Sequence, residues 1–161
     1  MDSLLPKALL YSDGSSRGNP GPGGYGTLVI FEEKIQKIAQ GFRKTTNNRM
    51  ELMGIIVGLE FLPVKSKVMV YSDSKYVVDA LQKGWLKNWI KKNFKGKKNQ
   101  TLWERFWRTY QQHKVTLSWI KGHDGHPENE ACDKMAVTAA LKGPWQIDKD
   151  YEKGIAASSL F

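Results

Sequence analysis

The sequence predicts one α/β domain built on a mixed sheet of five strands, with helices on its faces and a basic helical protrusion. Three apolar runs near the start, residues 9–11, 27–31 and 34–42, are joined by short connections, which predicts an antiparallel meander. Residues 50–62 are apolar nearly all the way round and predict a buried helix. Residues 68–71 form the next strand, which follows this long crossover and is therefore expected to lie parallel to the first strand.

The rest of the chain predicts further helices and one more strand. We expect helices over residues 74–82 and 101–113, and an alternating strand over residues 115–120. The last helix begins with Pro127 in its first turn and ends at Gly143-Pro144, which is a strong stop signal. The later strand adds to the parallel part of the sheet.

Composition limits the class of protein. With 40% hydrophobic residues the chain can form one core, which we assign to residues 1–143, with residues 144–161 as a C-terminal tail that is partly docked or mobile. Cys132 is the single cysteine, which excludes an internal disulfide and a cysteine-rich zinc site. Neither a membrane-length apolar run nor a signal peptide is evident, so we expect a cytoplasmic protein, and a monomer because no heptad repeat is present. The net charge of +9 favours a polyanionic partner.

The letters Tyr-Ser-Asp close two of the predicted strands, at Asp13 and at Asp73. The glycines and prolines that follow Asp13 are expected to end the first strand there. Ligands of open α/β sheets bind beyond the carboxyl ends of parallel strands, so the two carboxylates are expected to meet in one crevice. Because like charges repel, such a pair needs a shared proton or a bound cation.

Two more acidic residues extend this pair. Glu51 fits a capping box with Asn48, or it faces the sheet from the buried helix and joins the cluster. Asp133 is either a surface aspartate of the last helix or, because its neighbours are small, a residue that a metal or phosphate can approach closely. If all four converge, their oxygens suit two divalent cations, magnesium rather than zinc, and an in-line phosphodiester displacement.

A loop histidine and a basic stretch complete the candidates. The glycine-punctuated loop favours His123 or His126 over His113 for proton transfer, and the residues do not separate the first two. Residues 83–98 interleave lysines with tryptophans and contain no acidic residue. This pattern fits a solvated helical face, or a salt-sensitive and sequence-neutral grip on a nucleic-acid strand, which we favour.

Several rare strings occur in one order: Tyr-Ser-Asp-Gly-Ser, Gly-Asn-Pro-Gly-Pro-Gly-Gly-Tyr-Gly, Thr-Thr-Asn-Asn-Arg-Met-Glu-Leu, Tyr-Ser-Asp-Ser-Lys-Tyr-Val and Lys-Gly-His-Asp-Gly-His-Pro-Glu-Asn-Glu-Ala-Cys-Asp. From residue 9 to residue 141 the chain resembles type 1 ribonuclease H in its bacterial form. The resemblance implies the ribonuclease H-like fold and an endoribonuclease that hydrolyses the RNA strand of RNA–DNA hybrids. It further implies a two-metal mechanism with Mg²⁺, for which Mn²⁺ is a possible substitute, 3′-hydroxyl and 5′-phosphate products, and little sequence preference.

The resemblance also assigns roles to individual positions. It makes Asp13, Glu51, Asp73 and Asp133 the metal-binding catalytic carboxylates, and it selects His123 as the loop histidine that assists water activation or product release. It places near the RNA strand Asn19, Asn48 and Lys75, and near a DNA-phosphate pocket Thr46, Asn47 and Arg49. The DNA strand would contact the protrusion through Trp85, Lys87, Trp89, Lys91, Lys92, Lys95, Lys97 and Lys98.

This sequence departs from the family pattern at two of these positions. Lys75 stands where many bacterial members carry glutamine, which favours a phosphate contact over a base-edge hydrogen bond. Asp124 stands where a small residue commonly follows the loop histidine, and its charge would raise the pKa of His123 or attract a cation. Two alternative functions remain, a DNA strand-transfer enzyme, for which the chain is short, and a non-catalytic hybrid-binding module, which would leave the four carboxylates unexplained.

Overall fold

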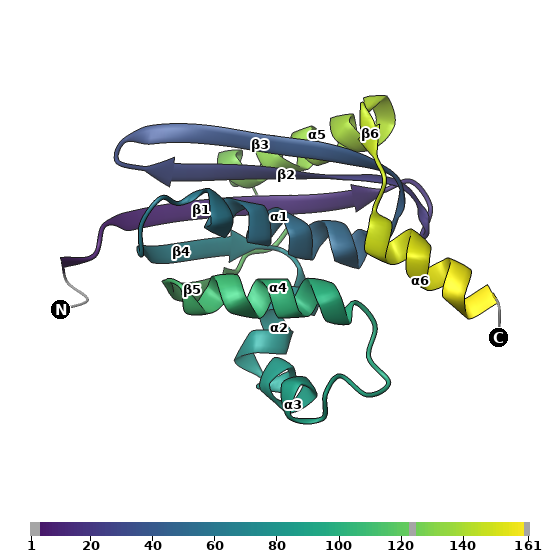
Figure 1. The fold of residues 1–161 in the computed structure, drawn as a ribbon. Coiled ribbons are helices and arrows are strands. Elements are labelled where there is room, and N and C mark those ends of the chain that lie inside the picture. The colour runs from purple at the N-terminus through teal and green to yellow at the C-terminus, as the bar shows by residue number, and fades with distance from the viewer. Residues whose placement is uncertain (1–3, 123–124, 160–161) are drawn as a thin grey trace.

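The computed structural model describes residues 4–122 and 125–159, which form a mixed six-stranded sheet with helices on both faces (Figure 1). Three strands, β1 (Lys7–Ser16), β2 (Gly21–Phe31) and β3 (Lys34–Thr45), form the predicted antiparallel meander. The parallel additions are β4 (Lys67–Ser72) beside β1 and β5 (Lys114–Trp119) beside β4. The strand order is β5-β4-β1-β2-β3-β6.

The sheet has one strand more than the five predicted. The short strand β6 (Trp145–Gln146) pairs in parallel with Gly41 and Phe42 at one end of β3. Two residues are too few to show a periodic pattern, so this strand is not predictable from the sequence. The predicted mixed arrangement of antiparallel and parallel strands is confirmed.

The first strand does not stop at Asp13, and this expectation is wrong. β1 continues through Gly14 to Ser16, because β2 runs alongside it and pairs Asp13 with Gly26 and Gly14 with Tyr25. What does end near Asp13 is the parallel pairing with β4, whose last partners are Tyr11 and Tyr71. Asp13 therefore lies inside an antiparallel strand pair but just beyond the parallel one.

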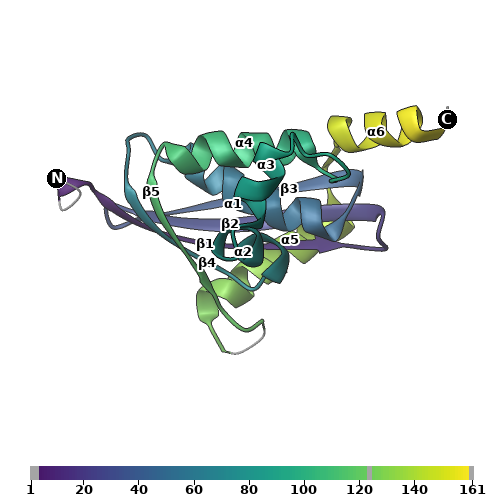
Figure 2. The same cartoon turned by 90° about the horizontal axis from the view of Figure 1, so that it is seen from below.

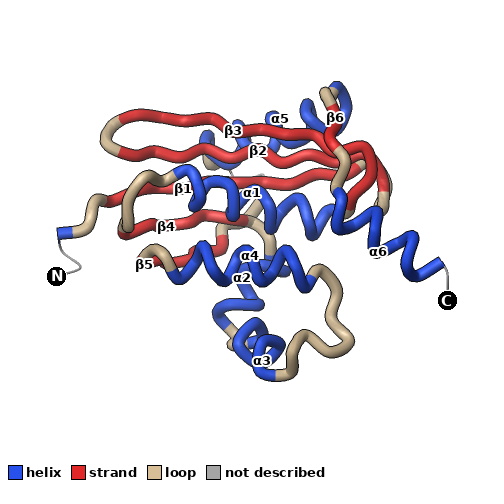
Figure 3. The backbone as a smooth tube through the Cα atoms, in the orientation of Figure 1, coloured by secondary structure: helices blue, strands red, loops and turns tan. Residues whose placement is uncertain are grey.

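Helices cover the two faces unequally (Figures 1 and 2). On one face lie α1 (Asn47–Phe61) and α4 (Gln100–Gln111), and on the other lies α5 (Pro127–Lys142). Beyond the β5 edge, α2 (Lys75–Gln82) and α3 (Trp85–Lys91) lead into a long loop, and α6 (Lys149–Ser159) closes the described chain (Figure 3). None of the described helices combines the length and the apolar character that a bilayer crossing requires.

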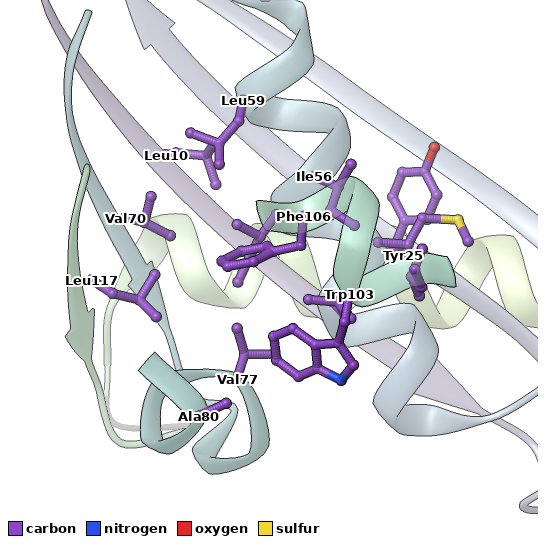
Figure 4. Close-up of a cluster of buried hydrophobic side chains, with 14 of the residues drawn as sticks. Leu10, Tyr25, Ile56, Leu59, Val70, Val77, Ala80, Trp103, Phe106 and Leu117 are labelled. Atoms are coloured by element: carbon purple, nitrogen blue, oxygen red, sulfur yellow. The ribbon is translucent and has the colours of Figure 1, made fainter. Parts of the chain in front are cut away.

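The main core lies between the sheet and the pair α1 and α4 (Figure 4). Leu10 from β1, Ile56 and Leu59 from α1, and Trp103 and Phe106 from α4 are all completely buried. The rings of Trp103 and Phe106 meet edge-on at 5.5 Å, an arrangement that aromatic quadrupoles favour. Because α1 is buried on both sides, its apolar residues need no polar stripe, which explains why the sequence pattern runs all round the helix.

Close approach of α5 to the sheet depends on small residues. A Cβ on Gly26 of β2 would collide with the carbonyl oxygen of Cys132, and would lie 3.0 Å from the backbone nitrogen of Ala136. A residue with a side chain at position 26 would therefore push the helix outward. The contact matters for function because Asp133 follows Cys132 directly.

The C-terminal segment, for which the sequence indicated no regular structure, contains β6 and α6 and is anchored by a buried ion pair. Asp148 receives two hydrogen bonds from the Arg49 guanidinium, from Nε at 2.7 Å and from Nη2 at 2.9 Å. It also accepts one from the hydroxyl of Thr45, at 2.7 Å. The side chains of Arg49 and Asp148 are 4% and 3% exposed, so neither charge has water as an alternative partner. The division at residue 143 remains a prediction.

The contribution of the Arg49–Asp148 ion pair to stability can be tested by substitution. Asp148→Ala leaves the Arg49 guanidinium buried without a counter-charge, which we expect to cost about 3–5 kcal/mol of unfolding free energy. Urea denaturation at pH 7 measures the change. Glu152→Ala is the matched control, because its bidentate partner Arg43 is 58% exposed and such surface pairs contribute about 1 kcal/mol or less. Equal losses in the two variants would contradict the anchoring role of Asp148.

Candidate functional site

The fold brings the four predicted carboxylates to one end of the sheet. Asp13 lies in β1 and Asp73 directly after β4, each two residues beyond the last parallel pair, Tyr11 and Tyr71. Glu51 comes from the first turns of α1 on one face of the sheet, and Asp133 comes from α5 on the other. The site is therefore assembled from four elements that are far apart in the sequence.

Asp13 is the most buried member of the cluster, at 7% exposed. One of its oxygens accepts a hydrogen bond from the Gly14 amide at 2.9 Å, and its protonated form donates to Asp133. Burial, then the negative charge of Asp73 and the contact with Asp133, raise the pKa of Asp13 to about 8, against the lowering effect of the Gly14 amide. At neutral pH this carboxyl holds its proton in the absence of a cation.

Glu51 joins the cluster instead of capping its helix. Of the two alternatives for Glu51, the capping box with Asn48 is wrong, because the helix begins after Thr46, whose hydroxyl accepts from the Arg49 amide at 3.3 Å. The carboxylate of Glu51 accepts instead from the Asn47 side chain at 2.6 Å and from the Ser74 hydroxyl. Burial and the nearby charge of Asp73 raise the pKa of Glu51, and the two hydrogen bonds oppose the rise.

Gly14 explains how α1 comes so near to β1. A Cβ at this position would collide with the backbone nitrogen of Glu51 and would lie 2.6 Å from the carbonyl carbon of Met50. Only glycine fits between the strand and the first turns of the helix. Gly14 thus allows the backbone of Glu51 to lie close to Asp13.

The donor set fits a hard divalent cation. All four groups offer carboxylate oxygens, the ligands that Mg²⁺ prefers. Burial first, and the negative charge of Asp73 second, raise the pKa of Asp13, and a bound cation would oppose both effects. Over residues 4–122 and 125–159, no three His, Cys, Asp or Glu side chains already form a closed group able to hold a metal ion. The interacting pairs are Asp13 with Asp73, Asp13 with Asp133, and Glu51 with Asp73.

The histidines differ in their surroundings. His113 is buried, its Nδ1 accepts from the Ser66 amide at 3.1 Å and its Nε2 lies 3.2 Å from the Leu59 carbonyl, so it holds two elements together. Burial lowers its pKa, which keeps it neutral. His126 is exposed at the N-cap position of α5. His123 and the neighbouring Asp124 lie outside the described residues.

The residues predicted near the nucleic acid surround the acidic cluster. Asn19 accepts from the Asn47 amide at 3.1 Å through its side chain, which joins the loop after β1 to the start of α1. Asn48 and Lys75 are exposed at the starts of α1 and α2. These positions are open to a substrate strand. Which of them contact RNA stays a prediction.

Arg49 does not have the exposure that its predicted phosphate contact requires. It is 3% exposed, two of its nitrogens bind Asp148, and Nη1 donates to Asn99 at 3.1 Å. Asn99 in turn donates to the Tyr76 hydroxyl at 3.2 Å. Arg49 therefore links the C-terminal segment to the loop before α4, and a direct phosphate contact would require the ion pair to open.

The protrusion presents its lysines to solvent but its two tryptophans differ. Trp85 is 43% exposed, whereas Trp89 is half-buried and packs edge-on against Trp103 at 5.5 Å. Each ring also carries a lysine ammonium, Lys83 at 5.2 Å from Trp85 and Lys97 at 5.4 Å from Trp89. The lysines predicted to bind nucleic acid are all exposed, namely Lys87, Lys91, Lys92, Lys95, Lys97 and Lys98.

Two residues near the site, Ser74 and Trp119, were not predicted from the sequence. Ser74 donates to Glu51 and caps α2 by accepting from the Val77 amide at 3.3 Å. Trp119, at the end of β5, donates through its indole nitrogen to the Asp73 carbonyl at 3.1 Å. The position of Trp119 could have been predicted from strand pairing. A strand that runs parallel to β4 and ends with Trp119 places this residue beside the Tyr-Ser-Asp string, since its partner is Ser72.

A sequence model described as RNase H matches residues 6–141. This chain belongs to the RNase H family. The ribonuclease H of Rippkaea orientalis is 50% identical to it over 161 aligned residues, which cover 96% of this chain and 99% of that protein. The crystal structure of LC9-RNase H1, a type 1 RNase H with the type 2 active-site motif, has a TM-score of 0.76 at 31% identity and covers 84% of this chain and 72% of its own.

A second solved relative contains nucleic acid. LC11-RNase H1, in complex with an RNA/DNA hybrid, has a TM-score of 0.63 at 25% identity, and the match covers 84% of this chain and 97% of that one. The family expected from the sequence motifs is therefore confirmed, and with it the RNase H fold. The roles of the individual site residues rest on their placement and on the resemblance.

The different burial of the two tryptophans yields a prediction. Trp85→Ala removes an exposed ring, so we expect hybrid affinity to fall about five- to tenfold or more while unfolding free energy changes by about 0.5 kcal/mol or less. Trp89→Ala removes a ring that packs on the core, so we expect a loss of about 2 kcal/mol or more. Fluorescence anisotropy with a labelled hybrid and urea denaturation separate the two effects. Equal effects of both variants on stability would contradict the assignment.

Proposed function

We propose that this protein is an endoribonuclease that hydrolyses the RNA strand of RNA–DNA hybrids with little sequence preference. The observation that carries the proposal is the meeting of Asp13, Glu51, Asp73 and Asp133 in a member of the RNase H family. Such a set is unfavourable for binding a polyanion unless cations bind as well. With cations present, the same set becomes a device for phosphodiester chemistry.

The metal requirement is divalent, and we propose Mg²⁺, two ions with substrate bound, with Mn²⁺ as a substitute. When bound by the four carboxylates, the ions supply Lewis acidity and an activated water for in-line displacement. The expected products carry 3′-hydroxyl and 5′-phosphate ends.

The chain's own residues prepare this chemistry. Asp13 must give up the proton that its surroundings hold, and its place in the rigid strand β1 fixes its direction. Asn47 and Ser74 hold the Glu51 carboxylate from two sides. We assign to His123 a role in moving a proton at the water or at the product, as the family resemblance implies.

Substrate preference follows from two surfaces. The RNA strand offers 2′-hydroxyls, which distinguish it from DNA, to polar side chains such as Asn19 and Asn48 beside the carboxylates. The lysines of the protrusion lie on α3 and the loop after it, where they would hold phosphates of the other strand. That LC11-RNase H1 was solved with an RNA/DNA hybrid supports this substrate. A monomeric state and a cytoplasmic location remain predictions from the sequence.

Substitution of the aspartates tests the proposal. Asp13→Asn and Asp73→Asn each remove a carboxylate, so we expect cleavage of a labelled hybrid to fall by about 10³-fold or more, since the cations stabilise the transition state by several kcal/mol. Hybrid binding by these variants should remain. Asp79→Asn serves as the control, because Asp79 pairs with Lys83 at the surface.

The alternatives predict other results on the same gel. A hybrid-binding module would bind the substrate and never cut it. A DNA strand-transfer enzyme would act on duplex DNA, which is therefore included beside duplex RNA. Undiminished turnover in Asp13→Asn would remove the acidic cluster from the mechanism.

A further inference from the structure

Trp119 is held at the edge of the acidic cluster. β5 runs parallel to β4, and its last residue lies beside Ser72, the residue before Asp73. The Ile120 amide donates to the Ser72 carbonyl at 2.9 Å, which continues the pairing past the strand end. The indole nitrogen of Trp119 then donates to the Asp73 carbonyl at 3.1 Å. The ring is 41% exposed and has a fixed orientation at the carboxyl ends of the two strands.

The ammonium group of Lys75 lies over this ring, 4.6 Å from its centroid. Lys75 is the first residue of α2 and follows Ser74, which two hydrogen bonds hold in place. The Ser74 amide donates to the Ser72 hydroxyl at 3.1 Å, and the Ser74 hydroxyl accepts from the Val77 amide at 3.3 Å. Its side chain is exposed. An indole face attracts a cation but carries no net charge, so the ring restrains the ammonium without neutralising it.

We propose that Trp119 is a positioning residue that holds the Lys75 ammonium as a contact for a backbone phosphate of the RNA strand beside the carboxylates. The inference rests on the proposed function. An ammonium has only donors and acts as a compact point charge, which suits a phosphate better than a base edge. Every nucleotide carries a phosphate, so this contact attracts the strand whatever its sequence.

The position of the Lys75 ammonium near Asp73 explains how it would help to bind the RNA strand. The carboxylates repel a polyanion until cations bind, and Lys75 sets a positive charge two residues from Asp73, where the strand must arrive. A lysine on a freely moving stem would lose rotamer entropy when it met the phosphate. The Trp119 ring restrains that stem beforehand, so less entropy remains to be lost on binding.

Salt dependence tests the phosphate contact. Hybrid binding is measured by fluorescence anisotropy between 50 and 200 mM salt, about the range over which phosphate contacts are resolved, in an Asp13→Asn background that does not cut. Lys75→Gln should lower the slope of log affinity against log salt by about 0.7–0.9. Lys37→Gln, which removes an equally exposed lysine on β3, should leave the slope unchanged. An unchanged slope in Lys75→Gln would overturn the phosphate contact.

A double-mutant cycle tests the role of Trp119. Trp119→Leu should weaken hybrid binding about two- to fivefold, and Trp119→Phe should restore most of the loss because it keeps an aromatic face. In the Lys75→Gln background, Trp119→Leu should cost nothing further. Additive losses, or a phenylalanine variant as weak as the leucine variant, would show that Trp119 acts through its hydrogen bond to Asp73 or through packing.

Two controls keep the outcomes apart. Thermal unfolding confirms that each variant is folded, and Lys75→Gln, an exposed change, tests the contact even where a Trp119 variant unfolds. Wild-type cleavage of the same hybrid is run alongside. Absence of cleavage there would remove the proposed function, whereas cleavage with an unchanged salt slope would remove only the inference about Lys75.

Discussion

The burial of the Asp13 carboxyl beside other carboxylates is the constraint on which the rest of the structure depends. Burial and the charge of Asp73 raise the pKa of Asp13 to about 8. The folded chain therefore holds a proton that the unfolded chain releases near pH 4, so without a cation this group costs stability as the pH rises from about 4 towards 8. A fold that keeps Asp13 buried beside Asp73 and Asp133 despite this cost must be rigid around it, and a cation that binds there offsets the cost.

Packing supplies that rigidity from both faces of the sheet. On one face, the buried core of Leu10, Trp103 and Phe106 presses α1 against β1, and Gly14 lets the first turns of the helix reach the strand. On the other face, Gly26 lets α5 approach closely enough to bring Asp133 to Asp13. The paired strands β1 and β4 set the spacing of the first two aspartates. Position therefore comes from the scaffold rather than from mobile loops.

Local sequence patterns predicted the features that depend on residues close together in the sequence. The repeated Tyr-Ser-Asp string located Asp13 and Asp73, and the apolar run before Pro63 located the central helix. The patterns failed where distant residues decide the outcome. Pairing with β2 carries β1 past Gly14, and partners on other elements engage Arg49 and Trp89. The ion pair between Arg49 and Asp148 joins residues 99 positions apart, and no periodicity in a segment of a few residues signals such a contact.

We propose that the four carboxylates form a site for a divalent cation. The most direct measurement is a calorimetric titration of the protein with Mg²⁺ in the presence of an uncleavable hybrid, with Asp13→Asn and Asp79→Asn beside the wild type. We expect the wild type and Asp79→Asn to bind Mg²⁺ alike, and Asp13→Asn to bind it at least about tenfold more weakly. Equal binding by all three proteins would contradict the claim, because the cation would then bind away from the cluster.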